Sequence, residues 1–242
     1  LVTTKAAKRA IQKHKKFLSL PLSTNDGRSL LEFDFLLMDT KKSRMMAKLF
    51  MKYLRSSGKV HVTTPAGTDM MFYKENRNPG FFNGVLRDGK GYSSSSIEVY
   101  VPIEETKTEG IMVLDGSLGY IGRAGEPTRI IFKGGRIVDI EETPTGIRLK
   151  KYMEEYFDPR IYIAGELGIG LNSCSNCLGN CYIEDESAYG TFHVGLGRNI
   201  ALGGVQNAKG HFDLVCREPD IFTDNRQIMD RGKIIAPEPV LY

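Results

Sequence analysis

Apolar and basic positions alternate with helical spacing over residues 40–56, and this is the clearest helix that the pattern predicts. Its apolar stripe consists of Met45, Met46, Leu49, Phe50, Tyr53 and Leu54. Ser57 and Gly58 end it. Upstream, residues 5–18 read as a basic helix, and the dense apolar run at 29–38 suits a buried strand.

From residue 59 the pattern changes to the two-residue alternation of strands. The expected strands, each bounded by Gly or Pro, are 59–63, 97–102, 110–114, 128–132 and 136–140. Gly134 and Gly135 predict a hairpin between the last two. A helix at 146–157 ends before Pro159. After residue 160 the chain is Gly-rich and alternates short strands with loops.

These elements predict a mixed α+β fold in two parts. Residues 1–60 are expected to form an α-rich N-terminal segment. Residues 61–242 are expected to form a strand-rich, Gly-rich metal-binding domain built on a mixed or antiparallel sheet. We find no internal repeat and no low-complexity linker between the two parts.

Composition narrows the function classes. The 242 residues are 41% hydrophobic with a net charge of +4, which argues against disorder and against a dedicated nucleic-acid binder. Apolar stretches such as 110–114 fall far short of the roughly 20 residues that span a bilayer, so no membrane role is expected. Nothing at the start resembles a secretory signal, so we expect a cytoplasmic protein whose cysteines are not paired as disulfides.

Candidate metal ligands come from four separate segments. His211 and Asp213 would share one face of a strand, where they can bind one ion or hydrogen-bond to each other. His193 lies in a glycine-rich run, and Glu166 in an apolar one where a carboxylate needs a cation, a proton or donors. Glu98 begins another apolar run, where it could equally be a charge on an edge strand. Together these side chains suit one or two divalent ions such as Zn, Mn or Co.

Four cysteines form a separate cluster near these ligands. Cys174, Cys177 and Cys181 follow one another closely, and Cys216 could be a fourth ligand. Their spacing fits a structural zinc site, or an iron–sulfur cluster of non-standard spacing. The alternative is a loop of unpaired, partly buried thiols.

Several of these segments occur in the order found in a known family. Residues 64–69 (Thr-Pro-Ala-Gly-Thr-Asp), the 98–102 strand, residues 165–168, and His193 with His211 and Asp213 resemble the metallo-aminopeptidases of the aminopeptidase T and aminopeptidase S type. Residues 132–139 also resemble that family's strand–turn–strand. The resemblance covers roughly residues 40–220.

The resemblance implies a hydrolase that releases N-terminal amino acids through a metal-activated water. It implies one or two divalent ions (Zn, Co or Mn), a small peptide or other small-molecule substrate, and a homodimer. Glu166 would act as the catalytic base or bridge the ions. The ligands that it carries over are Glu98, Glu166, His193, His211 and Asp213.

Three departures weaken the resemblance. The family has a Tyr where this chain has Ile200, so an oxyanion donor would have to come from elsewhere, with Tyr189 and Asn199 nearby in sequence. Family members carry a larger N-terminal α/β domain, of which residues 1–60 would be a remnant. The cysteine cluster is not a family feature.

Two alternatives stay open. The aminopeptidase superfamily also includes the 2,5-dihydroxypyridine dioxygenases, which use one non-haem iron, and His211 and Asp213 with a third ligand would suit that ion as well. The second alternative is a non-catalytic metal-binding relative. We favour the hydrolase because the dioxygenase pattern differs at the positions of Glu166 and His193.

Overall fold

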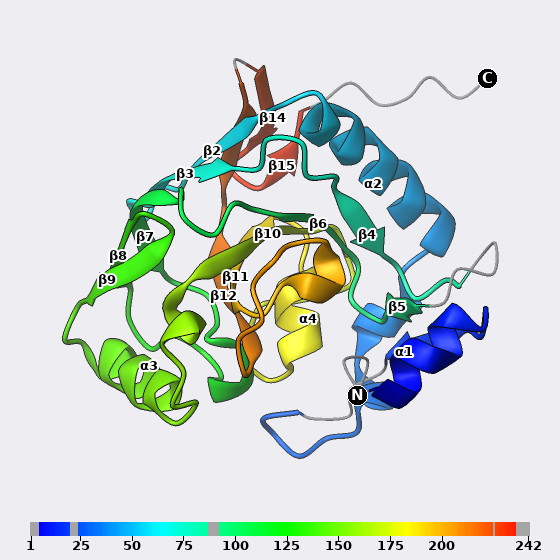
Figure 1. Ribbon diagram of the computed structural model, residues 1–242, viewed down its shortest axis with the longest axis horizontal. Helices are drawn as coiled ribbons and strands as arrows, with labels where there is room; N and C mark the ends of the chain where they lie inside the picture. The colour runs from blue at the N-terminus through cyan, green and yellow to red at the C-terminus, as the bar shows by residue number, and fades with distance from the viewer. Residues whose placement is uncertain (1–4, 20–23, 87–91, 225, 236–242) are drawn as a thin grey trace.

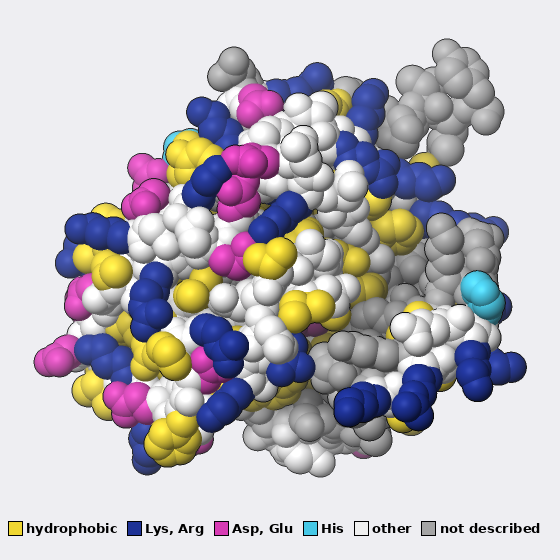
Figure 2. Space-filling model, viewed as in Figure 1, with side chains coloured by type: hydrophobic (Ala, Val, Ile, Leu, Met, Phe, Trp, Pro, Cys, Tyr) yellow, Lys and Arg dark blue, Asp and Glu magenta, His cyan; other side chains and the backbone are white. Residues whose placement is uncertain are grey.

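The computed structural model describes residues 5–19, 24–86, 92–224 and 226–235. Two antiparallel sheets, one of eight strands and one of five, dominate it, and helices lie around them (Figure 1). The expected mixed α+β fold with antiparallel sheets is therefore confirmed. On the left and upper parts of the face in Figure 2, Lys and Arg side chains lie among Asp and Glu, in keeping with the small net charge.

The larger sheet has the strand order β15-β14-β13-β2-β3-β7-β8-β9. Its members are β2 (Lys59–Thr63), β3 (Asp69–Tyr73), β7 (Glu109–Leu114), β8 (Thr128–Lys133), β9 (Arg136–Ile140), β13 (Asp220–Thr223), β14 (Arg226–Asp230) and β15 (Lys233–Ile234). The expected hairpin at Gly134 and Gly135 joins β8 to β9, and both glycines have the positive φ that the turn needs.

The smaller sheet has the order β12-β11-β10-β6-β4. Its members are β4 (Gly80–Phe82), β6 (Glu98–Pro102), β10 (Ala164–Gly170), β11 (Thr191–Gly197) and β12 (His211–Arg217). A separate parallel pair joins β1 (Phe17–Ser19) to β5 (Tyr92–Ser94).

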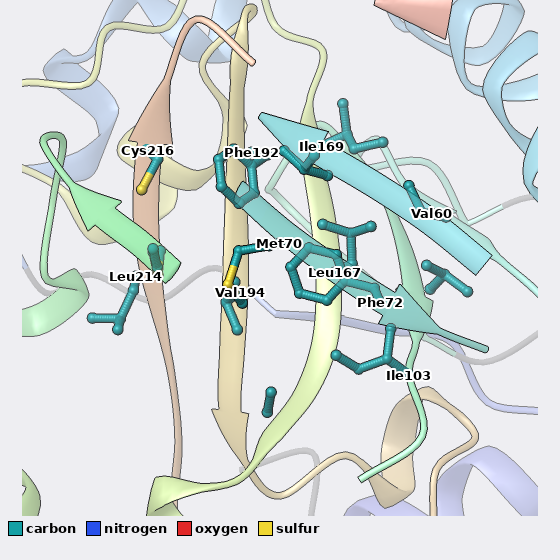
Figure 3. Close-up of a cluster of buried hydrophobic side chains, with 14 of the residues drawn as sticks. Val60, Met70, Phe72, Ile103, Leu167, Ile169, Phe192, Val194, Leu214 and Cys216 are labelled. Atoms are coloured by element: carbon teal, nitrogen blue, oxygen red, sulfur yellow. The ribbon is translucent and has the colours of Figure 1, made fainter. Parts of the chain in front are cut away.

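One continuous core lies between the two sheets. Figure 3 shows Met70 and Phe72 of β3 beside Leu167 of β10 and Phe192 and Val194 of β11. All five side chains are buried, and each contributes roughly 1.5–3 kcal/mol relative to exposure. Because strand residues alternate, this packing leaves every second residue of the smaller sheet for its other face.

Helices α2 (Thr40–Arg55) and α3 (Pro144–Glu154) pack on this core, whereas α1 (Lys5–Gln12) packs beside β1. The short α4 (Tyr182–Ser187) lies in front of β10–β12 (Figure 1). The α2 helix begins at the N-cap Asp39, whose carboxylate accepts from two backbone N–H groups, and it buries Phe50 and Leu54. None of the helices in the described part of the chain is long and apolar enough to span a bilayer.

The N-terminal segment is less helical than expected. The predicted basic helix stops at Gln12, and residues 17–19 form β1. The expected strand at 29–38 is instead two 3-10 turns, η1 (Leu30–Glu32) and η2 (Asp34–Leu37). Ser29 and Glu32 form a capping box that starts the first turn. The turns bury Leu30, Phe33 and Phe35 but leave Leu31 and Leu37 exposed, so apolar density alone misidentified this segment.

Other expected elements are confirmed, with small shifts of their ends. The helix at 146–157 is α3, which starts two residues earlier at Pro144 and ends at Glu154. The main core includes α2 residues such as Phe50 as well as strand residues beyond position 60. The division of the chain at residue 60 stays a prediction.

Candidate metal centre

Strand alternation gathers the five predicted ligands on one face of the smaller sheet. Glu98 comes from β6, Glu166 from β10, His193 from β11, and His211 and Asp213 from β12. The residues between them, such as Leu167, Val194, Phe212 and Leu214, point into the core. All five ligand candidates therefore project away from the core toward α4. Glu98 is buried on an inner strand, so the edge-strand alternative is wrong.

Glycines create the room for this cluster. Gly195 lies between Glu166 and Asp213 in the strand register, and Gly168 lies opposite His193. A β-carbon at Gly195 would stand 2.7 Å from Glu166 Oε2, and one at Gly168 would stand 1.9 Å from His193 Nε2. The Gly-rich pattern after residue 160 thus has a specific cause, because the ligand side chains lie over glycine backbone.

The ligand atoms converge closely. His193 Nε2 lies 3.0 Å from Glu98 Oε2, and His211 Nε2 lies 3.2 Å from Glu166 Oε2 and 3.3 Å from Asp213 Oδ1. Two groups each bring three ligand atoms within 4.8 Å of one another. One group is Glu98, Glu166 and His193, the other is Glu166, His211 and Asp213, and Glu166 belongs to both.

The chemistry of this set fits a metal ion. Four of the five residues are buried, while the side chain of His211 is 28% exposed. Among the described residues, Glu98 Oε2, His193 Nδ1, His211 Nδ1 and Asp213 Oδ1 are buried without a hydrogen-bond partner. Three buried carboxylates need positive charge close by, which a metal ion or protonated imidazoles can supply, and carboxylate with imidazole is a donor set that suits iron, zinc or manganese.

The pKa values show how the cluster balances its charge in the metal-free protein. Burial opposes protonation of His193, but Glu98, Asp213 and Glu166 raise its pKa to about 9. Burial likewise opposes charge on His211, yet Asp213 and Glu166 raise its pKa well above the ordinary value. Burial raises the pKa of Glu166. Protons on the imidazoles thus supply the positive charge that an ion would otherwise supply.

The short helix α4 covers the cluster and adds polar groups that the sequence analysis missed. The Tyr182 hydroxyl donates to Asp213 Oδ2, and the Tyr182 ring stacks on Tyr120 with centroids 4.3 Å apart. Glu186 is buried, and burial together with Glu98, Asp213 and Glu166 raises its pKa well above the ordinary value.

A sequence signal for α4 does exist. Glu184, Asp185 and Glu186 are three consecutive acids, a pattern that ordinarily marks an exposed surface, yet all three are buried. Asp185 accepts hydrogen bonds from the backbone N–H groups of Leu178 and Gly179. Apolar and aromatic neighbours on the N-terminal side, including Tyr182, were the clue that this acidic run packs inward.

Comparisons with known proteins identify the family. The family model of NicX, 2,5-dihydroxypyridine 5,6-dioxygenase, matches residues 34–236, a range that includes every ligand candidate. The chain belongs to the NicX family. It is 25% identical over 216 residues to the 2,5-dihydroxypyridine 5,6-dioxygenase of Pseudomonas putida KT2440, and the match covers 83% of this chain. The chain spans about 60% of that relative's length.

Two solved structures share the fold. The dioxygenase structure from Pseudomonas putida KT2440 superposes with a TM-score of 0.83 at 20% identity, covering 98% of this chain and 70% of that one. Wild-type AmpT from Thermus thermophilus superposes with a TM-score of 0.61 at 16% identity, covering 81% of this chain and 54% of that one.

The identification as an aminopeptidase is therefore wrong, and with it the hydrolase and metalloprotease function. NicX membership instead favours the alternative of a dioxygenase. The weaker likeness to AmpT concerns the fold alone, so a shared fold does not by itself fix the reaction.

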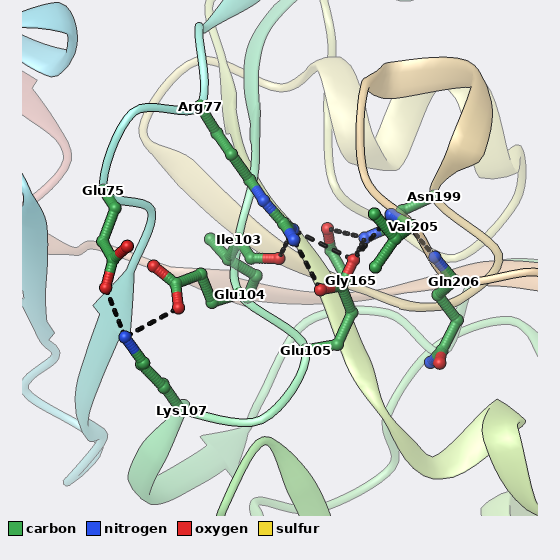
Figure 4. Close-up of polar contacts among 10 residues, drawn as sticks. All are labelled: Glu75, Arg77, Ile103, Glu104, Glu105, Lys107, Gly165, Asn199, Val205 and Gln206. Carbon is green, nitrogen blue, oxygen red and sulfur yellow. Dashed lines mark hydrogen bonds and ion pairs between the residues drawn. The ribbon is translucent and has the colours of Figure 1, made fainter.

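Asn199 is not available as an oxyanion donor in place of the missing Tyr, because its amide donates to Gly165 O and Glu105 (Figure 4). The Tyr189 hydroxyl accepts from the backbone N–H of Ile234, which leaves its own proton free to donate. The departure at Ile200, which counted against peptide hydrolysis, agrees with NicX membership.

Three of the four cysteines lie in different apolar clusters, and Cys174 is half-buried outside them. Cys177 packs with Ala188 and Val215, Cys181 belongs to a cluster with Leu30 and Phe35, and Cys216 lies in the main core. Among the described residues, the groups of three or more converging ligand atoms include no cysteine. Burial raises the pKa of Cys177 to about 12, which disfavours the thiolate that a metal needs. The second metal site of Cys174, Cys177, Cys181 and Cys216 stays a prediction.

Proposed function

We propose that this chain supplies the metal-binding part of a ring-cleaving dioxygenase for a small hydroxylated pyridine of the 2,5-dihydroxypyridine class. The observation that carries the proposal is the convergence of Glu166, His211 and Asp213 on one point, with His211 partly exposed. The family match over residues 34–236 supports the reaction class.

The group of Glu166, His211 and Asp213 would hold one iron(II) ion. One imidazole and two carboxylates leave coordination positions open, as non-haem iron oxygenases require. When bound, iron(II) supplies the redox chemistry that lets dioxygen react with an aromatic ring. Zinc, cobalt or manganese would suit the same ligand atoms but would not support this reaction equally.

The surrounding residues would control access and protons. The exposed edge of His211 marks the side from which a substrate approaches, because the other ligands are buried beneath α4. Glu98 lies beside the triad, 3.0 Å from the buried His193, and its carboxylate would accept a proton from a bound hydroxyl group. Tyr182 would hold Asp213 through its hydrogen bond.

Oxygen consumption tests the proposal. The anaerobically purified chain would be loaded with iron(II) and mixed with 2,5-dihydroxypyridine, using ¹⁸O₂ and mass spectrometry of the product. We expect one iron per chain and a product that has gained two oxygen atoms. His211→Ala should abolish uptake, whereas His61→Ala, which alters an exposed pair with Asp69, should not.

Opposite results would reject the function. Absence of oxygen uptake by the iron-loaded chain with dihydroxypyridines would count against it, as would release of amino acids from aminoacyl substrates by the zinc-loaded chain. Size-exclusion chromatography with light scattering on the same sample tests the predicted homodimer.

A further inference from the structure

A β-bulge decides the direction in which Glu166 points. Ala164 pairs with Leu196 and Glu166 with Gly195, so two steps along β10 match one step along β11, and Gly165 is the extra residue. Ala164 and Leu167 both lie in the core. In an unbroken strand Glu166 would share the face of Ala164, because residues two apart point the same way. The bulge therefore turns this carboxylate out of the core and toward the other ligands.

Asn199 holds the bulge in place. The Gly165 carbonyl accepts hydrogen bonds from Asn199 Nδ2 at 2.9 Å and from the backbone N–H of Ile103 at 3.1 Å. Asn199 is completely buried, and a β-carbon at Gly165 would stand 3.0 Å from its Nδ2. A larger residue at position 165 would require the buried Asn199 amide to shift.

Glu105 in turn fixes Asn199. Its Oε1 accepts from Asn199 Nδ2 at 2.8 Å and from the Val205 backbone N–H at 2.9 Å, and Arg77 binds both carboxylate oxygens at 3.0 and 2.6 Å (Figure 4). Arg77 also donates to the Ile103 carbonyl. Burial would raise the pKa of Glu105, but these hydrogen bonds lower it to about 2, so the carboxylate stays charged at neutral pH.

We propose that Asn199, held by the Arg77–Glu105 ion pair, is a positioning residue that fixes the Gly165 bulge and thereby aims Glu166 at the metal centre. Arg77, Glu105 and Asn199 come from three connections far apart in the chain. Arg77 binds Glu105, Glu105 binds Asn199, and Asn199 donates to the carbonyl that precedes Glu166. The inference rests on the part of the proposed function in which Glu166 is a metal ligand, and not on ring cleavage.

Cobalt(II) titration tests this directly, because its visible spectrum reports ligand geometry without any turnover. Asn199→Ala removes the donor to Gly165, and we expect cobalt(II) to bind roughly 10–100-fold more weakly with an altered spectrum. The control is Lys107→Met on the same loop as Glu105, which breaks only the exposed ion pairs with Glu75 and Glu104 (Figure 4). That variant should bind cobalt(II) as the unaltered chain does.

A second variant guards against a folding defect. Gly165→Ala disturbs the same contact from the strand side, since its methyl group would press on the Asn199 amide. Far-UV circular dichroism would establish which variants are folded. A folded Asn199→Ala or Gly165→Ala chain with unaltered cobalt(II) affinity and spectrum would overturn the inference.

Failure of the inference and failure of the proposed function give different results. If the unaltered chain binds cobalt(II) and Asn199→Ala weakens it, the positioning role holds even when no ring is cleaved. If the unaltered chain binds no cobalt(II), Glu166 is not a ligand and the positioning role is rejected. Oxygen uptake by the iron-loaded chain is measured separately and judges only the reaction.

Discussion

The imidazole of His193 lies directly over the backbone of Gly168 on the neighbouring strand, so close that a β-carbon there would be 1.9 Å from Nε2. This approach is what brings Nε2 within 3.0 Å of Glu98 on the strand beyond. His193 thus reaches across one whole strand, and only a residue without a side chain permits it.

Replacing that glycine should displace the imidazole. In Gly168→Ala we expect a loss of cobalt(II) affinity of at least about tenfold, together with a lower unfolding temperature, because the new methyl group occupies the position of Nε2. Gly58→Ala is the matched control, since a β-carbon at Gly58 meets no atom within 4 Å. Equal metal affinity in the two variants would show that His193 does not need this space.

The hydrogen bond from Tyr182 to Asp213 should matter for metal binding. Tyr182→Phe keeps the stacked ring but leaves Asp213 Oδ2 without this donor, and we expect roughly tenfold weaker cobalt(II) binding by isothermal calorimetry. Tyr120→Phe changes the other ring of the same stack and should leave the affinity unchanged. A larger effect of Tyr120→Phe than of Tyr182→Phe would contradict this role.

Metal binding should depend steeply on pH. A bound ion needs neutral imidazole, but in the metal-free chain Asp213 and Glu166 outweigh burial and raise the pKa of His211 well above its ordinary value. Cobalt(II) must therefore displace a proton from His211 at neutral pH. We expect the affinity to rise about tenfold per pH unit for each proton released. An affinity independent of pH from 6 to 9 would mean that His211 is already neutral.

Acid should weaken the fold through Glu105. The pKa of this carboxyl falls from an ordinary 4.5 to about 2 in the folded chain, because hydrogen bonds from Arg77, Val205 and Asn199 outweigh burial. The ionised Glu105 carboxylate therefore stabilises the folded chain fully above pH 4.5, and this stabilisation is lost as the pH falls toward 2. In urea unfolding at several pH values, acidification should lower the free energy of unfolding less in Glu105→Gln than in the unaltered chain.

The control for that measurement is an exposed carboxylate. Glu142→Gln alters a side chain that is 87% exposed and whose carboxylate forms a long, 3.7 Å ion pair with Lys150. Exposed pairs contribute little, so this variant should leave the acid dependence of unfolding unchanged. If Glu105→Gln loses as much stability on acidification as Glu142→Gln does, the ion pair with Arg77 does not stabilise the fold.

Patterns among residues that are neighbours in sequence correctly predicted α2 and the turn between β8 and β9. The stripe on α2 and the turn at Gly134 and Gly135 each depend on neighbouring residues, and both are confirmed. Residues 29–38 were predicted wrongly because the side-chain capping at Ser29, which apolar density does not reveal, competes with strand formation.

Part of the site could be predicted because strand alternation is also a local sequence signal. Alternation put His211 and Asp213 on one face from sequence alone. Glu98, Glu166 and His193 stood out by their apolar or glycine-rich settings before the family resemblance joined all five. Glu186 and Tyr182 were missed, because their roles depend on how α4 docks on the sheet. The reaction was misjudged, since this chain's fold is similar both to a dioxygenase and to an aminopeptidase, and a fold does not fix the reaction.

Since Glu166 contributes an oxygen to both groups of ligand atoms, the two groups are not independent. An ion bound by Glu98 and His193 would change the charge and orientation of the carboxylate on which the other group depends, and thermodynamic linkage makes this influence mutual. Ions at the two groups would then compete for the carboxylate of Glu166. Zinc bound beside Glu98 and His193 would therefore alter the affinity of Glu166, His211 and Asp213 for a second ion.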